Sequence, residues 1–183
     1  MESNPLPMTL QRQCCSSWCW AAVISTAIVG LKLVNLPQSQ GALVNQYYGP
    51  TVDCTGCCPG GCPDLEQACN LPALISPVLG FLQLAHGGGV VPDSRGFALI
   101  QSEIKQGHPV IAQIHYDDPP DQDHVMLIYG YAGSDTIWIG DPATGESWAA
   151  SYTAYLNHID ETAHGFHGSL QYLFTLNNLP VAG

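Results

Sequence analysis

Two residues that could perform nucleophilic catalysis lie far apart in the sequence, Cys19 near its beginning and His124 in its second half. The attacking form of a cysteine is the thiolate, whereas an ordinary thiol, with a pKa of about 8.5, is mostly protonated at neutral pH. A nucleophilic cysteine therefore needs positive charge beside it, which a helix N-terminus and an imidazolium both supply. Cys19 lies at the start of an apolar run with helical character, so we expect it to be the nucleophile.

The surroundings of His124 suit a general acid and base. The histidine stands at the head of an apolar strand, where a rigid sheet can aim its ring. Further along the chain, Asp141 ends the next predicted strand in a Gly-Asp-Pro turn. If the two strands pair as a hairpin, Asp141 comes near His124 and can accept its ring N–H, as the third member of a catalytic triad does. Asp123, Asp135 and the asparagines are alternatives for this orienting role.

A side-chain amide upstream of the cysteine could stabilise an oxyanion. Gln13 precedes Cys19 by six positions (19 − 13 = 6), which leaves room for a loop that returns to the helix start. Its N–H groups, together with the backbone N–H of Cys19, could bind the negative oxygen of a tetrahedral intermediate. Gln11 is close enough to take this role instead.

The pattern of elements predicts an α+β fold, with helices first and strands afterwards. We expect helices over residues 18–32, 37–48, 64–69, 72–84 and 94–106, the second of them opening at a proline. We expect strands over residues 110–116, 125–131, 136–139 and 170–176. The prediction is one domain over residues 1–183, with a helical lobe over about 11–90 and a β-rich lobe over about 91–180.

The segment Gln13-Cys-Cys-Ser-Ser-Trp-Cys19-Trp-Ala-Ala resembles the nucleophile segment of papain-like cysteine peptidases. Asp123-His124, with Gly130-Tyr131 after it, is similar to the histidine strand of that family. The resemblance covers the landmarks from Gln13 to about Pro142, and Trp-Cys-Trp-Ala-Ala is closest to a bacterial branch of small papain-like proteases, some of them effectors.

The resemblance implies a two-lobed papain-like fold, a helical lobe that carries the nucleophile and an antiparallel sheet that carries the histidine. It implies these roles: oxyanion donor for Gln13, nucleophile for Cys19, acid and base for His124, and orienting group for Asp141. Papain itself has Asn where Asp141 stands, and the tryptophan-containing turn after that Asn is absent here. The substrate pockets of the family therefore cannot be transferred to this chain.

Five of the eight cysteines form a cluster in a Gly- and Pro-rich region: Cys54, Cys57, Cys58, Cys62 and Cys69. Four thiolates could hold zinc, but disulfides are the favoured interpretation. If Cys19 stays free, seven cysteines remain, so at most three internal bridges can form. The resemblance implies a bridge from Cys57 or Cys58 to Cys69, and Cys14 or Cys15 as the partner of any crosslink from the nucleophile segment to this region.

The composition narrows the classes of partner. The formal net charge is −11, with 15 acidic and 4 basic residues, so nucleic acid and anionic membranes are unexpected partners. No apolar run is long enough to span a membrane, and the first ten residues lack the features of a signal peptide. The cysteine content nevertheless favours a secreted protein, or one delivered out of the producing cell, over a cytoplasmic one.

Two further groups of polar residues could bind a substrate or a metal. The acidic loop that holds Asp117, Asp118, Asp121 and Asp123 could favour basic side chains in a substrate. A second group could hold a metal in principle, but it lacks a metal-binding helix motif and a polar loop is the default interpretation; it consists of His158, Asp160, Glu161, His164 and His167.

The expected function is hydrolysis of peptide bonds by a monomeric protease that acts on a protein or peptide substrate. No metal and no organic cofactor is expected. Two alternatives remain at this level. One is an acyltransferase or transglutaminase-like enzyme that uses the same three residues and passes the thioester to an amine. The other is a non-catalytic, cysteine-rich binding module.

Overall fold

The computed structural model describes residues 5–49, 53–58, 66–84, 89–117, 122–157, 159–161 and 166–176. Its first part is helical, with the elements α1 (Cys19–Gly30), α2 (Gln40–Tyr48), the 3-10 turn η1 (Thr55–Cys57), α3 (Glu66–Cys69), α4 (Ile75–Phe81) and α5 (Gly96–Lys105). Its second part contains β1 (Val110–Tyr116), β2 (Gln122–Ala132), β3 (Thr136–Asp141), β4 (Glu146–Ser151), α6 (Tyr152–Asn157), β5 (Ile159–Glu161) and β6 (Phe166–Thr175). The α+β prediction is confirmed.

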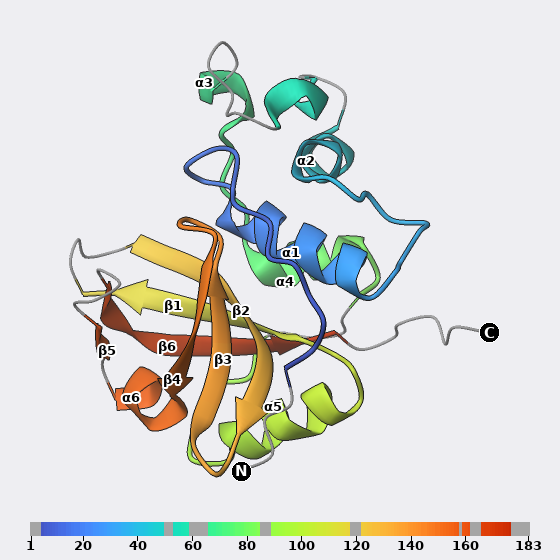
Figure 1. The fold of residues 1–183 in the computed structure, drawn as a ribbon. Coiled ribbons are helices and arrows are strands. Elements are labelled where there is room, and N and C mark those ends of the chain that lie inside the picture. Colours follow the sequence, from blue (N-terminus) through green and yellow to red (C-terminus); the bar gives the residue numbers. More distant parts are fainter. Residues whose placement is uncertain are drawn as a thin grey trace.

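The strands form one six-stranded antiparallel sheet in the order β4-β3-β2-β1-β6-β5. Figure 1 shows α1, α2, α3 and α4 gathered on one side of this sheet, with α5 and α6 away from them. Side chains alternate between the two faces of a strand. On β2, Val125 and Leu127 accordingly face the core that surrounds α1, and Met126 and Ile128 face the core that includes α5.

Helix α1 is buried on every side, because nine of its residues from Trp20 to Ile28 are inaccessible to solvent. A helix that is apolar all round is stable only in the middle of a core. Sheet side chains such as Ile111 pack with α1 in one cluster, and α2 and α4 contribute to the same cluster. The start of α1, at Cys19, is therefore held in a fixed position relative to the sheet.

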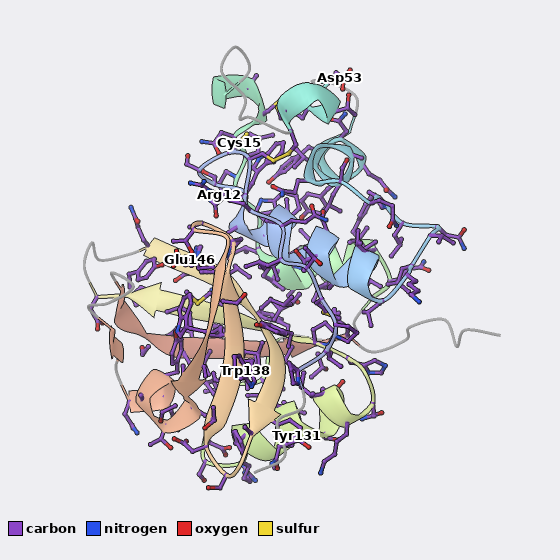
Figure 2. All side chains as sticks on the ribbon, in the orientation of Figure 1. Arg12, Cys15, Asp53, Tyr131, Trp138 and Glu146 are labelled. Carbon is purple, nitrogen blue, oxygen red and sulfur yellow. A yellow bond between two sulfur atoms is a disulfide. The ribbon has the colours of Figure 1, made fainter. Side chains whose placement is uncertain are left out.

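The segment before α1 runs along strands β2 and β3 and connects them to the helices. The N–H of Leu6 donates to the Tyr129 carbonyl at 2.7 Å, and the N–H of Gln13 donates to the Pro142 carbonyl at 2.8 Å. In Figure 2, Arg12 from this segment lies close to the β3–β4 turn, where its Nε donates to the Ala143 carbonyl at 3.3 Å. The segment thereby ties the start of α1 to the end of β3.

Two details differ from the sequence-based expectations. Helix α2 begins at Gln40 rather than at the proline, because the Ser39 hydroxyl accepts a hydrogen bond from the N–H of Ala42 and caps the helix there. Strands β4 and β5 and helix α6 were not predicted. Strand β4, for example, is a largely exposed edge strand without an apolar run, so its sequence gives a weak strand signal. The single-domain assignment and its lobe boundaries stay a prediction.

Among the described residues, no helix combines the length and the apolar character that a membrane crossing needs.

Candidate active site

Cys19 is the first residue of α1 and is half-buried. No side chain caps this end of the helix, since the N-cap residue is Trp18, which makes no capping hydrogen bond. The unpaired N–H groups and the positive end of the helix dipole therefore lie at the cysteine. The sulfur therefore lies beside backbone N–H groups that can donate hydrogen bonds.

His124, on β2, bridges Cys19 and Asp141. Its Nε2 lies 2.6 Å from Oδ1 of Asp141, which ends β3, and its ring is hydrogen-bonded to the Cys19 side chain as well. The three residues are thus brought together from α1, β2 and β3 (Figure 1). His124 is buried, and Asp141 is inaccessible to solvent.

The electrostatics of this group favour an ion pair. Burial lowers the pKa of His124, but hydrogen bonds to Asp141 and Cys19, together with their charges, raise it overall to about 9. Burial raises the pKa of Asp141, but the hydrogen bond and charge of His124 and the backbone N–H of Ala143 outweigh it, so the pKa is lowered. At neutral pH the histidine therefore carries a proton and the aspartate is ionised.

Tyr116 covers the histidine ring, a contact that the sequence analysis missed. The two rings are stacked, with centroids 5.9 Å apart and planes inclined by 17°. Burial, followed by the charges of Asp141 and Cys19, raises the pKa of Tyr116, so its hydroxyl stays neutral. The antiparallel register of β1 with β2 places Tyr116 opposite Gln122, beside the histidine. The contact depends on the register of the β1–β2 hairpin, which the sequence alone does not show.

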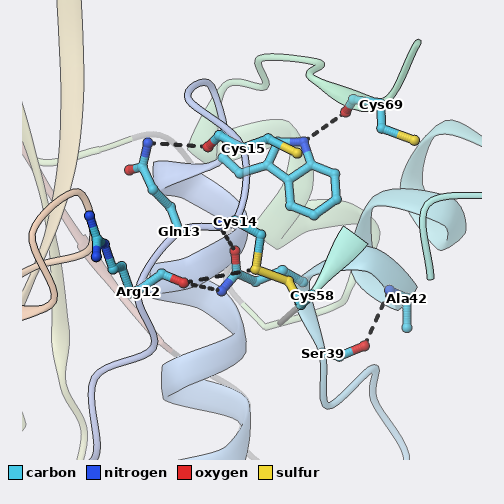
Figure 3. Close-up of a disulfide and its surroundings, with 10 residues drawn as sticks. Arg12, Gln13, Cys14, Cys15, Ser39, Ala42, Cys58 and Cys69 are labelled. Atoms are coloured by element: carbon cyan, nitrogen blue, oxygen red, sulfur yellow. Dashed lines mark hydrogen bonds between the residues drawn. A yellow bond between two sulfur atoms is a disulfide. The ribbon is translucent and has the colours of Figure 1, made fainter. Parts of the chain in front are cut away.

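Gln13 directs its side-chain amide to the loop before α1. Its Nε2 donates to the carbonyls of Ser16 at 2.7 Å and Cys15 at 3.2 Å, and the second of these bonds is drawn in Figure 3. In this arrangement the amide orders the backbone that leads to Cys19. Its two N–H groups are then engaged by the protein itself.

The loop from Ser16 to Trp20 is attached to the segment after α3. Asn70 bonds it twice, accepting from the N–H of Ser17 and donating to the Ser16 hydroxyl, each at 2.7 Å. The indole of Trp18 donates to the carbonyl of Cys69 at 2.7 Å, and that of Trp20 donates to a carbonyl two residues further along. These contacts hold the backbone on both sides of Cys19 in place.

Disulfides secure the same region. Cys14 is bonded to Cys58 and Cys54 to Cys69, and Cys15 is also disulfide-bonded; the first of these bonds is shown in Figure 3. The expected link from the nucleophile segment to the cysteine cluster is confirmed by the Cys14–Cys58 bond.

The expected bridge from Cys57 or Cys58 to Cys69 is wrong, because Cys69 pairs with Cys54. The cause is the docking of α2. Asn45 accepts a hydrogen bond from the N–H of Cys54 at 2.8 Å, and Gly41 packs directly on the Cys54 carbonyl. Cys57 is buried and does not form a disulfide. Because these bonds occupy three of the five thiols of the cluster, they favour the disulfide interpretation over zinc.

A cleft of about 660 Å³ opens beside the cysteine and the histidine. One wall belongs to the helical part and is mainly apolar; it contains Trp20, Pro72, Ala73, Leu74 and Ile75. The other wall belongs to the sheet and contains Gln113, Tyr116, Gln122, Asp123 and Val125. Ser16 and Ser17 also line it, whereas Gln13 does not. Cys19 and His124 lie between these walls as part of the cleft lining.

A comparison with known families agrees with this geometry. The model of a family described as the Peptidase_C39 like family matches residues 6–162. The chain belongs to this family. Membership places this Peptidase_C39-like protein in the cysteine peptidase superfamily, and the helices with an antiparallel sheet are consistent with a papain-like fold. No curated protein matches the chain.

The remaining candidates lie elsewhere. Asp135 bonds Ser151 and Thr153, far from the histidine in the pairing of β3 with β4, so it does not orient His124. Asp123 bonds the ring of His115 and the side-chain amide of Gln113, both on β1, instead of His124. Several other predicted residues, or their side chains, lie outside the described residues, namely Cys62, Asp118, Asp121, His158, Asp160, Glu161, His164 and His167. Gln11 uses its backbone N–H to bond Thr26.

Proposed function

We propose that this Peptidase_C39-like protein is a cysteine protease that hydrolyses peptide bonds through a thioester intermediate. The proposed roles are nucleophile for Cys19, acid and base for His124, orienting carboxylate for Asp141, and oxyanion donor for Gln13. The observation that carries the proposal is the continuous hydrogen-bonded chain from Cys19 through His124 to Asp141. It lies at the uncapped start of a helix and beside an open cleft.

The proposed first half-reaction begins from the thiolate–imidazolium pair. The sulfur of Cys19 attacks the substrate carbonyl carbon, and the new C–S bond forms as the carbonyl becomes an oxyanion. The intermediate then collapses, the C–N bond breaks, and His124 gives its proton to the departing amine. Asp141 keeps the ring oriented and stabilises its charge. The product is a thioester on Cys19.

The second half-reaction uses water. Neutral His124 takes a proton from the water, whose oxygen attacks the thioester carbon, and the C–S bond breaks to release the acid. The thiolate and the imidazolium are thereby restored. No metal or organic cofactor enters either step.

The oxyanion needs donors in both steps. The backbone N–H of Cys19 lies at the uncapped helix start, where it is already oriented. The amide of Gln13 would have to turn away from the carbonyls of Cys15 and Ser16 to join it. We therefore propose that substrate binding completes the oxyanion site by drawing this amide toward the cleft.

The bacterial branch and the compartment are also proposals. The sequence Trp18-Cys-Trp-Ala-Ala22 supports placement among the small papain-like proteases of bacteria. The disulfides support a site of action outside the reducing cytoplasm, after secretion or delivery from the producing cell. A protein or peptide substrate and a monomeric state complete this proposal.

The test compares the wild type with Cys19→Ala on a panel of denatured proteins, with products read by mass spectrometry. We expect the wild type to generate new free termini and Cys19→Ala to generate none. Equal cleavage by both proteins would remove the assignment of the nucleophile. Ligated or deamidated products in place of new termini would instead show the acyl-transfer reaction.

A further inference from the structure

The sheet wall of the cleft carries an acidic group that the proposed mechanism does not use. Asp123 precedes His124 on β2, so its side chain points to the opposite face of the strand, the face shared with Val125. Asp123, Val125 and Gln113 all line the cleft next to the catalytic pair. The Asp123 carboxylate can therefore contact a substrate side chain that occupies this part of the cleft.

Two neighbours on β1 hold the carboxylate in place. His115 lies directly opposite Asp123 in the register, and its Nδ1 is 2.9 Å from Oδ1. Gln113 donates from Nε2 to Oδ2 at 2.8 Å. Cross-strand contacts of this kind fix the rotamer of a side chain, which reduces the ordering cost when a ligand binds. Each carboxylate oxygen of Asp123 retains a further lone pair, and the side-chain amide oxygen of Gln113, Oε1, is a further acceptor.

The charge of Asp123 is not neutralised by a lysine or arginine in the cleft. The chain has four such residues, all within its described part, and none of them lines the cleft. Arg95 pairs with Asp93, Lys105 lies over the ring of Tyr131, and Arg12 bonds the Ala143 carbonyl. The side chain of Asp123 is 47% exposed, so a ligand can reach it from the cleft.

The opposite wall suits an aliphatic chain. Leu74 and Ile75 face the sheet wall across the cleft, with Pro72 and Ala73 beside them. Leu74 is 69% exposed, so its side chain is accessible to a ligand in the cleft. A lysine or arginine has both parts that this cleft accommodates, an apolar stem and a cationic head.

We propose that Asp123 is a specificity-determining residue that selects substrates with a lysine or arginine next to the bond that is cleaved. This inference rests on the proposed peptidase function. The stem of the basic side chain packs between Val125 and the Leu74–Ile75 wall, and the head binds the Asp123 carboxylate and the Gln113 carbonyl oxygen. The acidic character of the chain then assists the approach of basic peptides.

The test uses peptide reagents that do not require turnover. Dipeptidyl chloromethyl ketones alkylate an activated cysteine, and they can carry lysine or its uncharged analogue norleucine at either of the two positions before the reactive group. The readout is the ratio of inactivation rates, lysine over norleucine, with alkylation of Cys19 followed by mass spectrometry. Matched peptide substrates with the same exchange give the ratio of kcat/KM.

We expect the lysine reagent to react roughly twofold to fivefold faster at one of the two positions, as suits a half-exposed ion pair. Asp123→Asn should bring this ratio close to one. Asp117→Asn, which removes an exposed acid outside the cleft lining, should leave the ratio unchanged. Asp123→Glu should retain most of the preference, and Gln113→Lys, which places a cation on the same wall, should abolish it.

Some results would overturn the inference. An unchanged ratio in folded Asp123→Asn would do so, and so would an equal loss in Asp117→Asn, which would indicate general charge attraction. Should Asp123→Asn fail to fold, as judged by circular dichroism, Gln113→Lys decides alone. If the reagents show the preference while no peptide is hydrolysed, Asp123 keeps its role and the proposed hydrolysis fails.

Discussion

The two parts of the molecule that form the site are held together in different ways. The segment around Cys19 has little regular structure before α1 and is fixed by disulfides and by side chains such as Asn70 that bond backbone groups. The hairpin that carries His124 and Asp141 is fixed by the backbone hydrogen bonds of an antiparallel sheet. Covalent crosslinks therefore position the proposed nucleophile, Cys19, whereas the hydrogen bonds of a sheet position the proposed base and its partner.

The two sides of the site are therefore sensitive to different perturbations. Reducing agents act on the nucleophile side, and substitutions that disturb charge act on the sheet side. The two sides meet where Gln13 donates its N–H to the carbonyl of Pro142, one residue beyond Asp141.

The largest effect is expected from Asp141→Ala, on the sheet side. The substitution removes the carboxylate that bonds the ring of His124 and stabilises its imidazolium. We expect kcat/KM to fall by about 10³-fold, while circular dichroism stays unchanged. The control is Asp135→Ala, which affects an acid of the same sheet region that bonds Ser151 and Thr153. Equal losses in the two variants would contradict the role of Asp141.

On the nucleophile side, the double substitution Cys54→Ala with Cys69→Ala removes a crosslink that spans a sequence separation of 15. A disulfide that closes a loop of this size contributes about 3 kcal/mol. We expect the free energy of unfolding in urea to fall by about that amount, with a loss of activity as Trp18 and Asn70 lose their anchor. Cys57→Ala removes a cysteine without a crosslink and should cost less.

A smaller effect is expected from Gln13→Ala, at the junction of the two sides. Loss of an oxyanion donor lowers kcat by about 10²-fold, and here the N–H of Cys19 remains as a second donor. We expect KM to change little, because the donor acts mainly on the transition state. Gln11→Ala, the alternative donor from the sequence, is the matched control. A greater loss in Gln11→Ala would reverse the assignment.

The smallest effect concerns pH. The pKa of His124 is raised to about 9 by its contacts with Asp141 and Cys19, which outweigh burial. The protonated ring therefore persists through neutral pH, and kcat/KM should decline only as the pH rises through about 9. The pKa of His124 is higher in the folded chain than in the unfolded chain. Its contribution to the free energy of unfolding is therefore complete below about pH 6.5 and is lost as the pH rises through about 9. A decline centred near pH 6.5 in both measurements would contradict the ion pair.

The sequence predicted the sheet side better than the nucleophile side. Short apolar runs mark β2 and β3 in the sequence, so the pairing of these two strands and the approach of Asp141 to His124 could be anticipated. The start of α1 was also predictable from its apolar run. These features depend on local patterns, which a sequence displays directly.

The parts that were missed depend on contacts between distant segments. The choice of Cys54 as the partner of Cys69 follows from the docking of α2, in which Asn45 and Gly41 contact Cys54. The stacking of Tyr116 on His124 follows from the register of β1 with β2. Neither contact leaves a local signal, so neither could be predicted from a single sequence.

The central claim is that the imidazolium of His124 activates Cys19, and the rate of Cys19 alkylation by iodoacetamide at pH 6 tests it most directly. The buried thiol of Cys57 and the urea-unfolded chain serve as internal references. We expect Cys19 in the folded wild type to react much faster than either reference, and we expect His124→Asn to remove the difference. Activation by His124 would be contradicted if Cys19 reacted no faster than in the unfolded chain, or if its rate were the same in His124→Asn.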